Sequence, residues 1–275
     1  MEPQTRSQLD AFFGAMASAS RALLMLDYDG TLAPFHQKRH QASPYPGVAD
    51  LIQDIMRNRF TRVVVVSGRD TSETIPLLGI HPAPEVWGLH GLQRCSPGGD
   101  IATLTVPTEV LEALSDADRW LAYQQLRHTA EYKTGSIAVH WRGLAEHDAE
   151  HIRGRVLLGW APIASCTGLD LLEFDGGVEI RAPEADKGDV VHTLLGESGP
   201  GTSAAYLGDD ATDEHAFRAI GGNGLSVLVR PRRRHTAAQV WLRPPEELVT
   251  FLTEWLRTCE AHGRLGGEAI AAVSR

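Results

Sequence analysis

The chain has 275 residues, of which 43% are hydrophobic and 22% are charged, and its formal net charge at pH 7 is −9. This length and composition predict a globular protein with one large domain or two modest ones. The negative charge argues against a surface built to neutralise nucleic-acid phosphates, and the short basic run Arg230 to Arg234 is interpreted as a solvated turn.

The cysteines and the N-terminus indicate where such a chain is found. Cys95, Cys166 and Cys259 lie far apart and form no C-x-x-C pair, which favours a reducing compartment. The N-terminus has no basic segment followed by an apolar core, and no stretch approaches the length that crosses a bilayer. We therefore expect a cytoplasmic protein without membrane or nucleic-acid partners, and we expect a monomer.

The first predicted strand ends in two acidic residues. The apolar run Leu23 to Leu26 is followed by Asp27, Tyr28, Asp29, Gly30 and Thr31. An uninterrupted apolar run predicts a strand buried on both faces, as in a parallel sheet covered by helices. Such sheets bind ligands beyond the carboxyl ends of their strands. Because side chains alternate along an extended chain, the two carboxylates are expected to face one side together.

Two carboxylates this close resist joint ionisation, so either a bound cation lies between them or one keeps its proton. Mg²⁺ prefers oxygen ligands and completes its shell with water and substrate phosphate, so it needs few carboxylates. A calcium loop of the EF-hand kind is excluded, because its fifth and twelfth positions are Thr31 and Lys38. A plain acidic turn remains the alternative.

Helical and strand patterns alternate along the next part of the chain. Val48 to Asn58 carries apolar residues at the spacing of an amphipathic helix. Val63 to Val66 predicts a second buried strand, which ends in Ser67, Gly68 and Arg69 before a helix start.

The pattern changes between residues 94 and 181, which we interpret as an inserted α+β cap domain within a core formed by residues 1–93 and 182–275. Ser136 to Arg142 alternates in polarity, as expected of a half-buried strand. Leu169 to Phe174 and Val178 to Arg181 flank Asp175, Gly176 and Gly177, a sequence that favours a tight hairpin turn.

The C-terminal part returns to the first pattern. Ala204 to Leu207 predicts another buried strand, which ends in Gly208, Asp209 and Asp210, and Pro244 to Arg257 predicts a last helix followed by a loose tail. Alternating helices and strands are typical of a doubly wound, mostly parallel α/β sheet.

Four motifs occur in this chain order: D-Y-D-G-T at Asp27, V-S-G-R with Ser67, D-K-G with Lys187 and G-D-D-A-T-D-E at Gly208. Together they resemble the haloacid dehalogenase superfamily of phosphotransferases, which implies a Rossmann-like core. Within it the chain is most similar to the trehalose-6-phosphate phosphatases, and the resemblance spans Leu23 to about Ala219. Further matching segments are G-L-H-G at Gly88, E-Y-K at Glu131, H-W-R at His140 and V-E-I-R-A-P at Val178. The chain departs from the family at Gln93, where an acidic residue is common.

The resemblance implies a role for each matching residue. Asp27 would be the nucleophile that forms an aspartyl-phosphate, and Asp29 would be the general acid and base. The implied ligands of Mg²⁺ are Asp27, the backbone carbonyl of Asp29, and Asp209, with Asp210 and Asp213 as further or outer ligands. The implied phosphate-binding residues are Ser67, Gly68, Arg69 and Lys187, where Lys187 also offsets charge in the transition state.

Substrate specificity would lie in the cap, because phosphoryl transfer needs a lid that excludes water. The expected sugar-binding residues are His90, Glu131, Lys133, His140, Arg142 and Glu179. The implied activity is Mg²⁺-dependent hydrolysis of trehalose 6-phosphate to trehalose and phosphate. Two simpler interpretations stay open: Glu131 and Lys133 form a cross-strand ion pair on a wet face, and Asp209 to Glu214 is an acidic helix start.

Other functions remain alternatives. The nearest is a phosphatase or phosphomutase that acts on another glycosyl phosphate, since one core serves both. His147 to His151 spells H-x-x-E-H, the inverted zinc-peptidase helix, although no third ligand accompanies it. A sugar-phosphate sensor without catalysis is the third, and the intact carboxylate pair argues against it.

Overall fold

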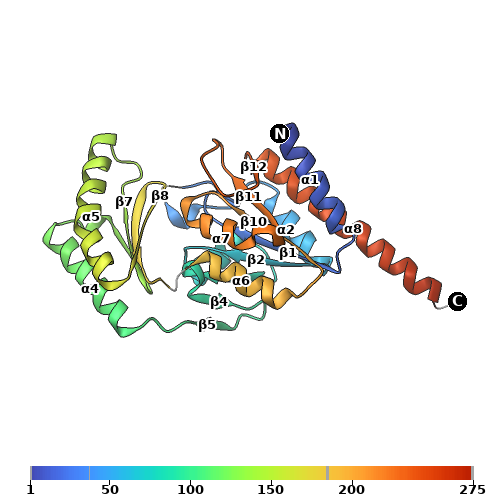
Figure 1. Ribbon diagram of the computed structural model, residues 1–275, viewed down its shortest axis with the longest axis horizontal. Helices are drawn as coiled ribbons and strands as arrows, with labels where there is room; N and C mark the ends of the chain where they lie inside the picture. Colours follow the sequence, from blue (N-terminus) through green and yellow to red (C-terminus); the bar gives the residue numbers. More distant parts are fainter. Residues whose placement is uncertain (1, 37, 184–185, 274–275) are drawn as a thin grey trace.

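A computed structural model of the protein describes residues 2–36, 38–183 and 186–273. The fold has two parts that lie side by side along the long axis of the molecule (Figure 1). The larger part is a sheet with helices on both faces, and the smaller part is a second sheet with two helices on its outer side. Within the described ranges, no helix has both the length and the apolar character needed to span a bilayer.

The larger sheet is mostly parallel. Its strands in the described chain, in spatial order, are β12 (Val240–Leu242), β11 (Gly224–Val229), β10 (Thr202–Gly208), β1 (Arg21–Asp27), β2 (Thr61–Val66), β3 (Glu85–Gly88), β4 (Gln93–Cys95) and β5 (Ile101–Thr103). Neighbours from β12 to β3 run parallel, and β4 and β5 are antiparallel additions at one edge. The three strands predicted from buried apolar runs are β1, β2 and β10, at the centre of the sheet.

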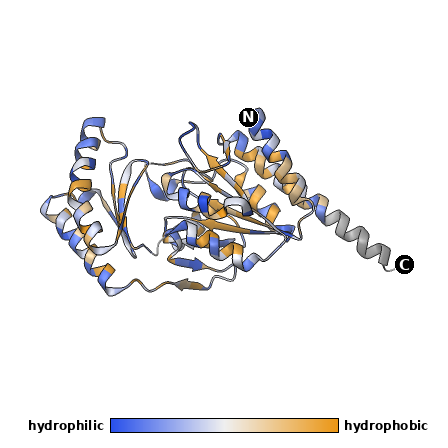
Figure 2. Ribbon diagram, in the orientation of Figure 1, coloured by the Kyte–Doolittle hydropathy of each residue, from blue (hydrophilic) through white to orange (hydrophobic). Residues whose placement is uncertain are grey.

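Helices cover both faces of this sheet. One face packs against α1 (Pro3–Met16), α2 (Val48–Arg57), α3 (Thr71–Leu78) and α8 (Glu246–Val273), and the other against α6 (Lys187–Ser198) and α7 (Glu214–Ile220). Short 3₁₀ turns connect several elements: η1 (Arg39–Gln41), η2 (Leu89–Gly91), η4 (Ala211–Asp213) and η5 (Gly221–Asn223). Alternate residues of β1 enter the two hydrophobic layers, with Leu24 and Leu26 in one and Leu23 and Met25 in the other. The hydrophobic colouring of Figure 2 follows this central sheet.

The second sheet is antiparallel and has the order β6 (Ala130–Lys133), β7 (Ser136–His140), β9 (Gly177–Arg181) and β8 (Asp170–Phe174). Helices α4 (Thr108–Tyr123) and α5 (Glu146–Thr167) cover one face, and the turn η3 (Arg127–Thr129) precedes β6. Ile137 and Val139 of β7 pack against Trp160 in this layer. The predicted hairpin is β8–β9, with Asp175 and Gly176 at its turn.

The sequence boundary at Arg94 falls inside β4. Because β4 pairs with β3 and β5 pairs with β4, the segment from Gln93 to Thr103 extends the larger sheet. We therefore propose that the inserted domain begins after Thr103.

The last helix is longer than the pattern predicted. We expected it to end at Arg257, with a loose tail, but α8 continues to Val273. Its next turn still packs on the core, since Cys259 is buried and the His262 ring stacks on Phe60 with centroids 4.1 Å apart. This packing stabilises the helical turn that follows Arg257.

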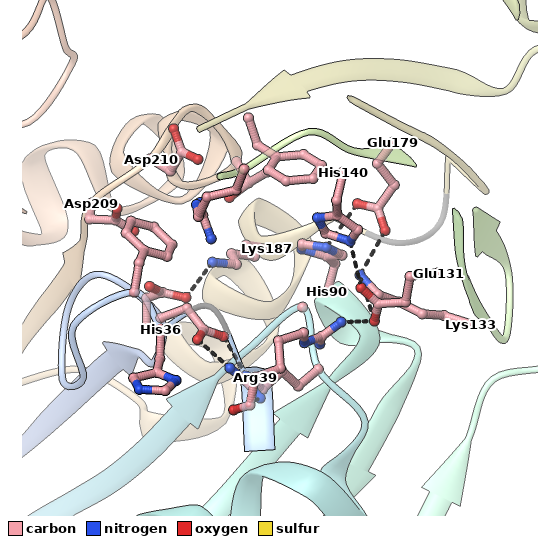
Figure 3. A pocket seen from close by; sticks show the side chains of 18 residues that line it. His36, Arg39, His90, Glu131, Lys133, His140, Glu179, Lys187, Asp209 and Asp210 are labelled. Carbon is pink, nitrogen blue, oxygen red and sulfur yellow. Dashed lines mark hydrogen bonds and ion pairs between the residues drawn. The ribbon is translucent and has the colours of Figure 1, made fainter. Parts of the chain in front are cut away.

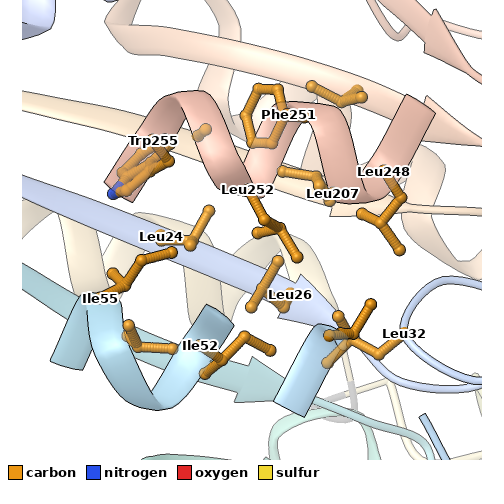
Figure 4. Packing of buried hydrophobic residues seen from close by; sticks show 14 of the residues in the cluster. Leu24, Leu26, Leu32, Ile52, Ile55, Leu207, Leu248, Phe251, Leu252 and Trp255 are labelled. Atoms are coloured by element: carbon orange, nitrogen blue, oxygen red, sulfur yellow. The ribbon is translucent and has the colours of Figure 1, made fainter. Parts of the chain in front are cut away.

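Trp255 of α8 anchors the layer between α8, β1 and α2 (Figure 4). Its side chain is fully buried, packs against Phe13 and Phe251, and donates from Nε1 to Thr61 Oγ1 at 2.9 Å. This contact joins both chain ends to β2.

We predict that Trp255→Ala lowers the free energy of unfolding by about 3–5 kcal/mol, because it leaves a cavity and removes the hydrogen bond from Trp255 to Thr61. Equilibrium urea denaturation measures the change. The matched control is Leu158→Ala on α5, whose side chain is exposed and should cost little. Equal losses in the two variants would contradict this account of the core.

Candidate active site

The candidate site is a cavity between the carboxyl ends of the central strands and the open face of the second sheet. The predicted site residues that line it are Asp27, Asp29, Gly68, Arg69, His90, Glu131, Lys133, His140, Arg142, Glu179, Lys187, Asp209 and Asp210. Figure 3 shows that side chains from both sheets point into the same space. The other two predicted residues, Ser67 and Asp213, lie buried behind the lining.

Lys187 joins two of the buried carboxylates. It is the first residue of α6, and its Nζ donates to Asp27 Oδ1 at 2.6 Å and to Asp213 Oδ1 at 2.7 Å. The other oxygen of Asp27 accepts from Thr31 Oγ1 at 3.1 Å. Burial opposes the charge on Lys187, but Asp213 and Asp27 outweigh it and raise the pKa of the ammonium group. Lys187 is therefore a permanent cation in the floor of the cavity.

Asp213 is the most heavily bonded of these acids. It accepts from Lys187, from the Tyr206 hydroxyl at 2.7 Å, and from the backbone amides of Asp209 and Asp210 at 3.0 Å each. Burial alone would raise the pKa of Asp213, but Lys187 and Tyr206 hold it below its usual value. Asp213 is thus an ionised anchor that orients Lys187.

Asp27 and Asp209 carry the charge that Lys187 does not balance. Burial raises the pKa of Asp27 to about 7, against the opposing effect of Lys187. Burial and the Asp27 and Asp213 carboxylates raise the pKa of Asp209 well above its usual range. Two neighbouring carboxyls that resist ionisation indicate a place for further positive charge.

The residues present fit a divalent cation. Within the described residues, Asp27, Asp209 and Asp213 form the one group of potential ligands whose oxygens all lie within 4.8 Å of one another. Asp209 Oδ2 is buried and has no hydrogen-bond partner. Hard cations prefer such carboxylate oxygens. Gly30 preserves this space, because it has a φ of +86° and a Cβ there would lie 2.2 Å from Asp209 Oδ2.

Asp29 is engaged by Arg69 rather than free in the cavity. Arg69 Nε lies 2.5 Å from Asp29 Oδ2, and Arg69 Nη2 donates to Oδ1 at 2.6 Å. Arg69 Nη1 also donates to the carbonyl of Arg39 at 2.9 Å. Because both oxygens are occupied, proton transfer to a substrate requires Asp29 to rotate away from Arg69.

The loop after β2 forms a second wall of the site. Ser67 Oγ accepts from the backbone amide of Arg69 at 3.1 Å, so it shapes the loop in this structure. Gly68 lets the His90 ring approach closely, since a Cβ at Gly68 would lie 2.5 Å from that ring. Gln93 supports the loop from outside, because its amide accepts from the Thr71 backbone at 3.1 Å and donates to Asp70 at 2.8 Å. A glutamate at position 93 could not donate to Asp70.

The second sheet presents polar residues in adjacent rows. The register pairs Glu131 with Ala138 and Ala138 with Glu179, so two acids flank one small side chain. Lys133 Nζ lies 3.0 Å from Glu179 and 4.0 Å from Glu131. Glu131 and Lys133 lie on the same strand, β6, so they do not form the cross-strand pair considered from the sequence. The cross-strand contact of Lys133 is with Glu179 on β9, and all three residues line the cavity.

Two histidines complete this wall in their neutral form. Burial lowers the pKa of both His90 and His140 to about 4. His90 Nε2 lies 3.1 Å from Glu179, and His140 Nε2 lies 2.8 Å from Glu131. Burial would raise the pKa of Glu179, yet Lys133 and His90 hold it well below the usual value. The wall therefore offers carboxylates, an ammonium group and neutral imidazoles, which suit hydroxyl-rich ligands.

Comparison with known protein families gives a match over most of the chain. The family model of trehalose-phosphatases matches residues 25–244. The chain belongs to the trehalose-phosphatase family. It is 30% identical over 251 residues to a trehalose-phosphate phosphatase of Mycobacterium marinum, covering 84% of this chain and 60% of that protein. It spans 18% to 61% of the length of several other mycobacterial relatives.

Solved structures confirm the fold expected of this family. The C-terminal domain of a trehalose-6-phosphate phosphatase from C. albicans superposes with a TM-score of 0.78 at 19% identity, covering 90% of this chain and 96% of that one. A haloacid dehalogenase-like hydrolase from B. subtilis gives a TM-score of 0.60 at 15% identity, covering 84% and 98%. The predicted membership of the trehalose-phosphatase family is thus confirmed by the family model, and the chain shares its fold with the haloacid dehalogenase-like hydrolase.

The basic run after β11 is not the solvated turn that we predicted. Arg230 and Arg234 are each only 24% exposed. Arg234 donates to the backbone oxygens of Asp209 and Asp210, and Arg230 donates to Asp209 O at 3.3 Å and to Asp175 Oδ2 at 3.2 Å. The prediction was wrong for these two residues because their guanidinium groups bond to the backbone oxygens of Asp209 and Asp210. The local sequence pattern does not reveal that contact.

Asp210 occupies a different position from the other acids. Its side chain caps η4 by accepting from the Ala211 amide at 2.7 Å, and it accepts from the Asp175 amide of the β8–β9 turn at 2.8 Å. The helix-start interpretation therefore describes Asp210 and Asp213, which form the capping box of η4, but Asp213 also belongs with Asp209 and Asp27 to the buried carboxylate cluster.

His147 and His151, the histidines of the H-x-x-E-H pattern, are exposed near the start of α5. Within the described chain, neither belongs to a cluster that could hold a metal ion. In this structure the pattern lies on a solvated helix face.

The site also includes residues that no sequence motif predicted, among them Arg39, Tyr206, Asp175 and Arg230. Arg39 lies in a loop without a motif, and Tyr206 reads as one more apolar strand residue. Only the Asp-Gly turn signal at Asp175 could have drawn attention to its place.

We predict that Lys187→Met lowers the free energy of unfolding by about 3–5 kcal/mol, because it leaves buried carboxylates without their cation. Urea denaturation with and without added MgCl₂ measures it, and the divalent cation should restore part of the loss. The control is Arg57→Met on α2, whose side chain is 68% exposed. Unchanged stability in the Lys187 variant would contradict the assigned charge balance.

Proposed function

We propose that this chain hydrolyses trehalose 6-phosphate to trehalose and phosphate, with Mg²⁺ as its divalent cation. The observation that carries the proposal is that one cavity joins the buried Asp27–Lys187 pair to the polar wall of Glu131, Lys133 and Glu179. A site for a sugar phosphate needs one region that binds and attacks the phosphate and another that binds the sugar hydroxyls. The names of the relatives agree with this substrate class.

The chemistry divides between named groups. Asp27 attacks phosphorus in line and takes the phosphoryl group as an aspartyl-phosphate, which splits one difficult displacement into two steps. Asp29 gives a proton to the leaving sugar oxygen and then takes one from the attacking water. Lys187 stabilises the charge on the transferring oxygens.

The supporting residues prepare these steps. Asp213 keeps Lys187 aimed at Asp27. Ser67, which accepts from the Arg69 amide in this structure, would donate its hydroxyl to a phosphoryl oxygen, with Gly68 and Arg69 beside it. Mg²⁺ would be held by Asp27, Asp209 and the backbone carbonyl of Asp29, with Asp213 behind them, and it would neutralise charge on the phosphate oxygens. The unpartnered Asp209 oxygen supports this assignment.

The polar wall would bind the sugar remote from phosphate. Carboxylates and a lysine placed together hold several hydroxyls at once, and they reject ligands that leave them unpaired. Glu179 is 2% exposed, and its oxygens already pair with Lys133, Ser136 and His90, so its role would be to hold Lys133 in place for a sugar hydroxyl.

A substrate panel scored for free phosphate tests the proposed activity. We predict turnover of trehalose 6-phosphate that exceeds that of glucose 6-phosphate, and loss of both on adding EDTA with recovery by MgCl₂. Equal turnover of the two esters would remove the specificity claim. Full activity in chelator would remove the metal from the proposal.

We predict that Asp27→Asn reduces kcat by roughly 10³-fold or more, since an amide cannot accept the phosphoryl group. Its thermal midpoint should stay unchanged or rise, because one of three clustered carboxylates is removed. Steady-state kinetics and thermal denaturation measure the two effects. Normal turnover in this variant would show that the nucleophile is misassigned.

A further inference from the structure

The space between the two sheets consists of two adjoining cavities. The inner one, which contains Asp27 and Lys187, has a volume of about 110 Å³. The outer one, towards α3, has a volume of about 790 Å³. Six residues line both: His36, Arg39, Arg69, Glu131, His140 and Arg142.

The inner cavity is small for the proposed substrate. Sites for small organic ligands commonly have volumes of about 300–1,000 Å³. The outer cavity lies in that range and the inner one lies below it. A disaccharide phosphate that reaches Asp27 must therefore extend across the boundary between the two.

The boundary is crossed by an ion pair. Arg39, on the η1 turn of the core, reaches Glu131 on β6 of the second sheet, and Figure 3 shows this contact between Arg39 and Glu131. Arg39 is 34% exposed and Glu131 is 23% exposed, so the pair is neither deeply buried nor fully solvated. Both residues line both cavities.

Each partner has an alternative when the pair opens. Arg39 Nη2 lies 3.6 Å from Glu73 on α3, so its guanidinium can turn outward to that carboxylate. Glu131 keeps His140 at 2.8 Å and Lys133 at 4.0 Å. Opening therefore leaves no charge without a partner, and its cost is small.

We propose that the Arg39–Glu131 pair is a gate that divides the substrate cavity, and that Arg39 sets the length of the sugar phosphate the site accepts. With the gate closed, a monosaccharide phosphate is less restricted than a disaccharide phosphate, because it extends less far from Asp27 towards the outer cavity. With Arg39 turned to Glu73, the two cavities join and accommodate a disaccharide. The inference rests on the proposed phosphatase activity, which it deepens.

Substitutions at Arg39 and at its outward partner Glu73 should change KM for trehalose 6-phosphate in opposite directions. Arg39→Gln removes the pair and should lower KM for trehalose 6-phosphate by about two- to fivefold, while KM for glucose 6-phosphate and kcat for both stay unchanged. Glu73→Gln removes the outward partner and should raise KM for the disaccharide ester alone. Arg57→Gln, on the exposed side of α2, is the matched control.

Ionic strength gives an independent readout. Salt screens a partly exposed ion pair, so the wild-type preference for trehalose 6-phosphate over glucose 6-phosphate should increase between low and moderate NaCl. The Arg39→Gln variant should show no such change, because its gate is already open. A preference that is independent of salt in the wild type would count against the gate.

Other kinetic results would overturn it. A higher KM for trehalose 6-phosphate in Arg39→Gln would make Arg39 a sugar contact, and equal changes for both esters would place its effect at the phosphate. Failure of the proposed function is seen separately, as a wild type that cleaves glucose 6-phosphate but not trehalose 6-phosphate. If Arg39→Gln then gains the disaccharide activity the gate stands, and if it does not, the gate falls too.

Discussion

The buried ammonium group of Lys187, held between Asp27 and Asp213, is the interaction on which the site depends. Three carboxylates collect at the carboxyl ends of β1 and β10, where they would otherwise repel one another in a water-poor space. Lys187 pairs with Asp27 and Asp213, and a divalent cation would neutralise the negative charge that remains on the cluster. The same charges that make the cluster costly to bury make it suited to a phosphoryl group.

The second sheet also places acidic side chains beside basic partners, with Glu131 more exposed to solvent than the cluster at Lys187. Glu179 is buried and ionised because Lys133 and His90 surround it, and Glu131 is shared by His140 and Arg39. Each acid therefore has a partner before substrate arrives. Under the proposed function, sugar hydroxyls would have to compete with these contacts, while the pairing at Lys187 would keep Asp27 in place.

Core and cap meet through contacts at opposite sides of the cavity. Arg39 reaches Glu131 on one side, and Arg230 with Asp210 holds the Asp175 turn on the other. In the proposed reaction, closing this cavity would exclude water from phosphoryl transfer. The two contacts differ in kind, since the Asp175 turn is held by a backbone amide and an ion pair, whereas Arg39 is held by its side chain alone. The Arg39 contact can open by rotation of one side chain.

The sequence by itself determined the central strands, the hairpin at Asp175 and the acids that end β1 and β10, because these depend on local periodicity and on short motifs. It could not assign β4 and β5 to the larger sheet, since three-residue edge strands carry too little pattern, and it ended α8 at Arg257. Tertiary structure alone decided that Tyr206 supports Asp213, that Arg69 occupies Asp29 and that Arg39 reaches Glu131. Arg69 and Asp29 meet only when β1 and β2 pair, Arg39 and Glu131 meet only when the two sheets pack together, and Tyr206 and Asp213 meet only because the loop after β10 folds back on that strand.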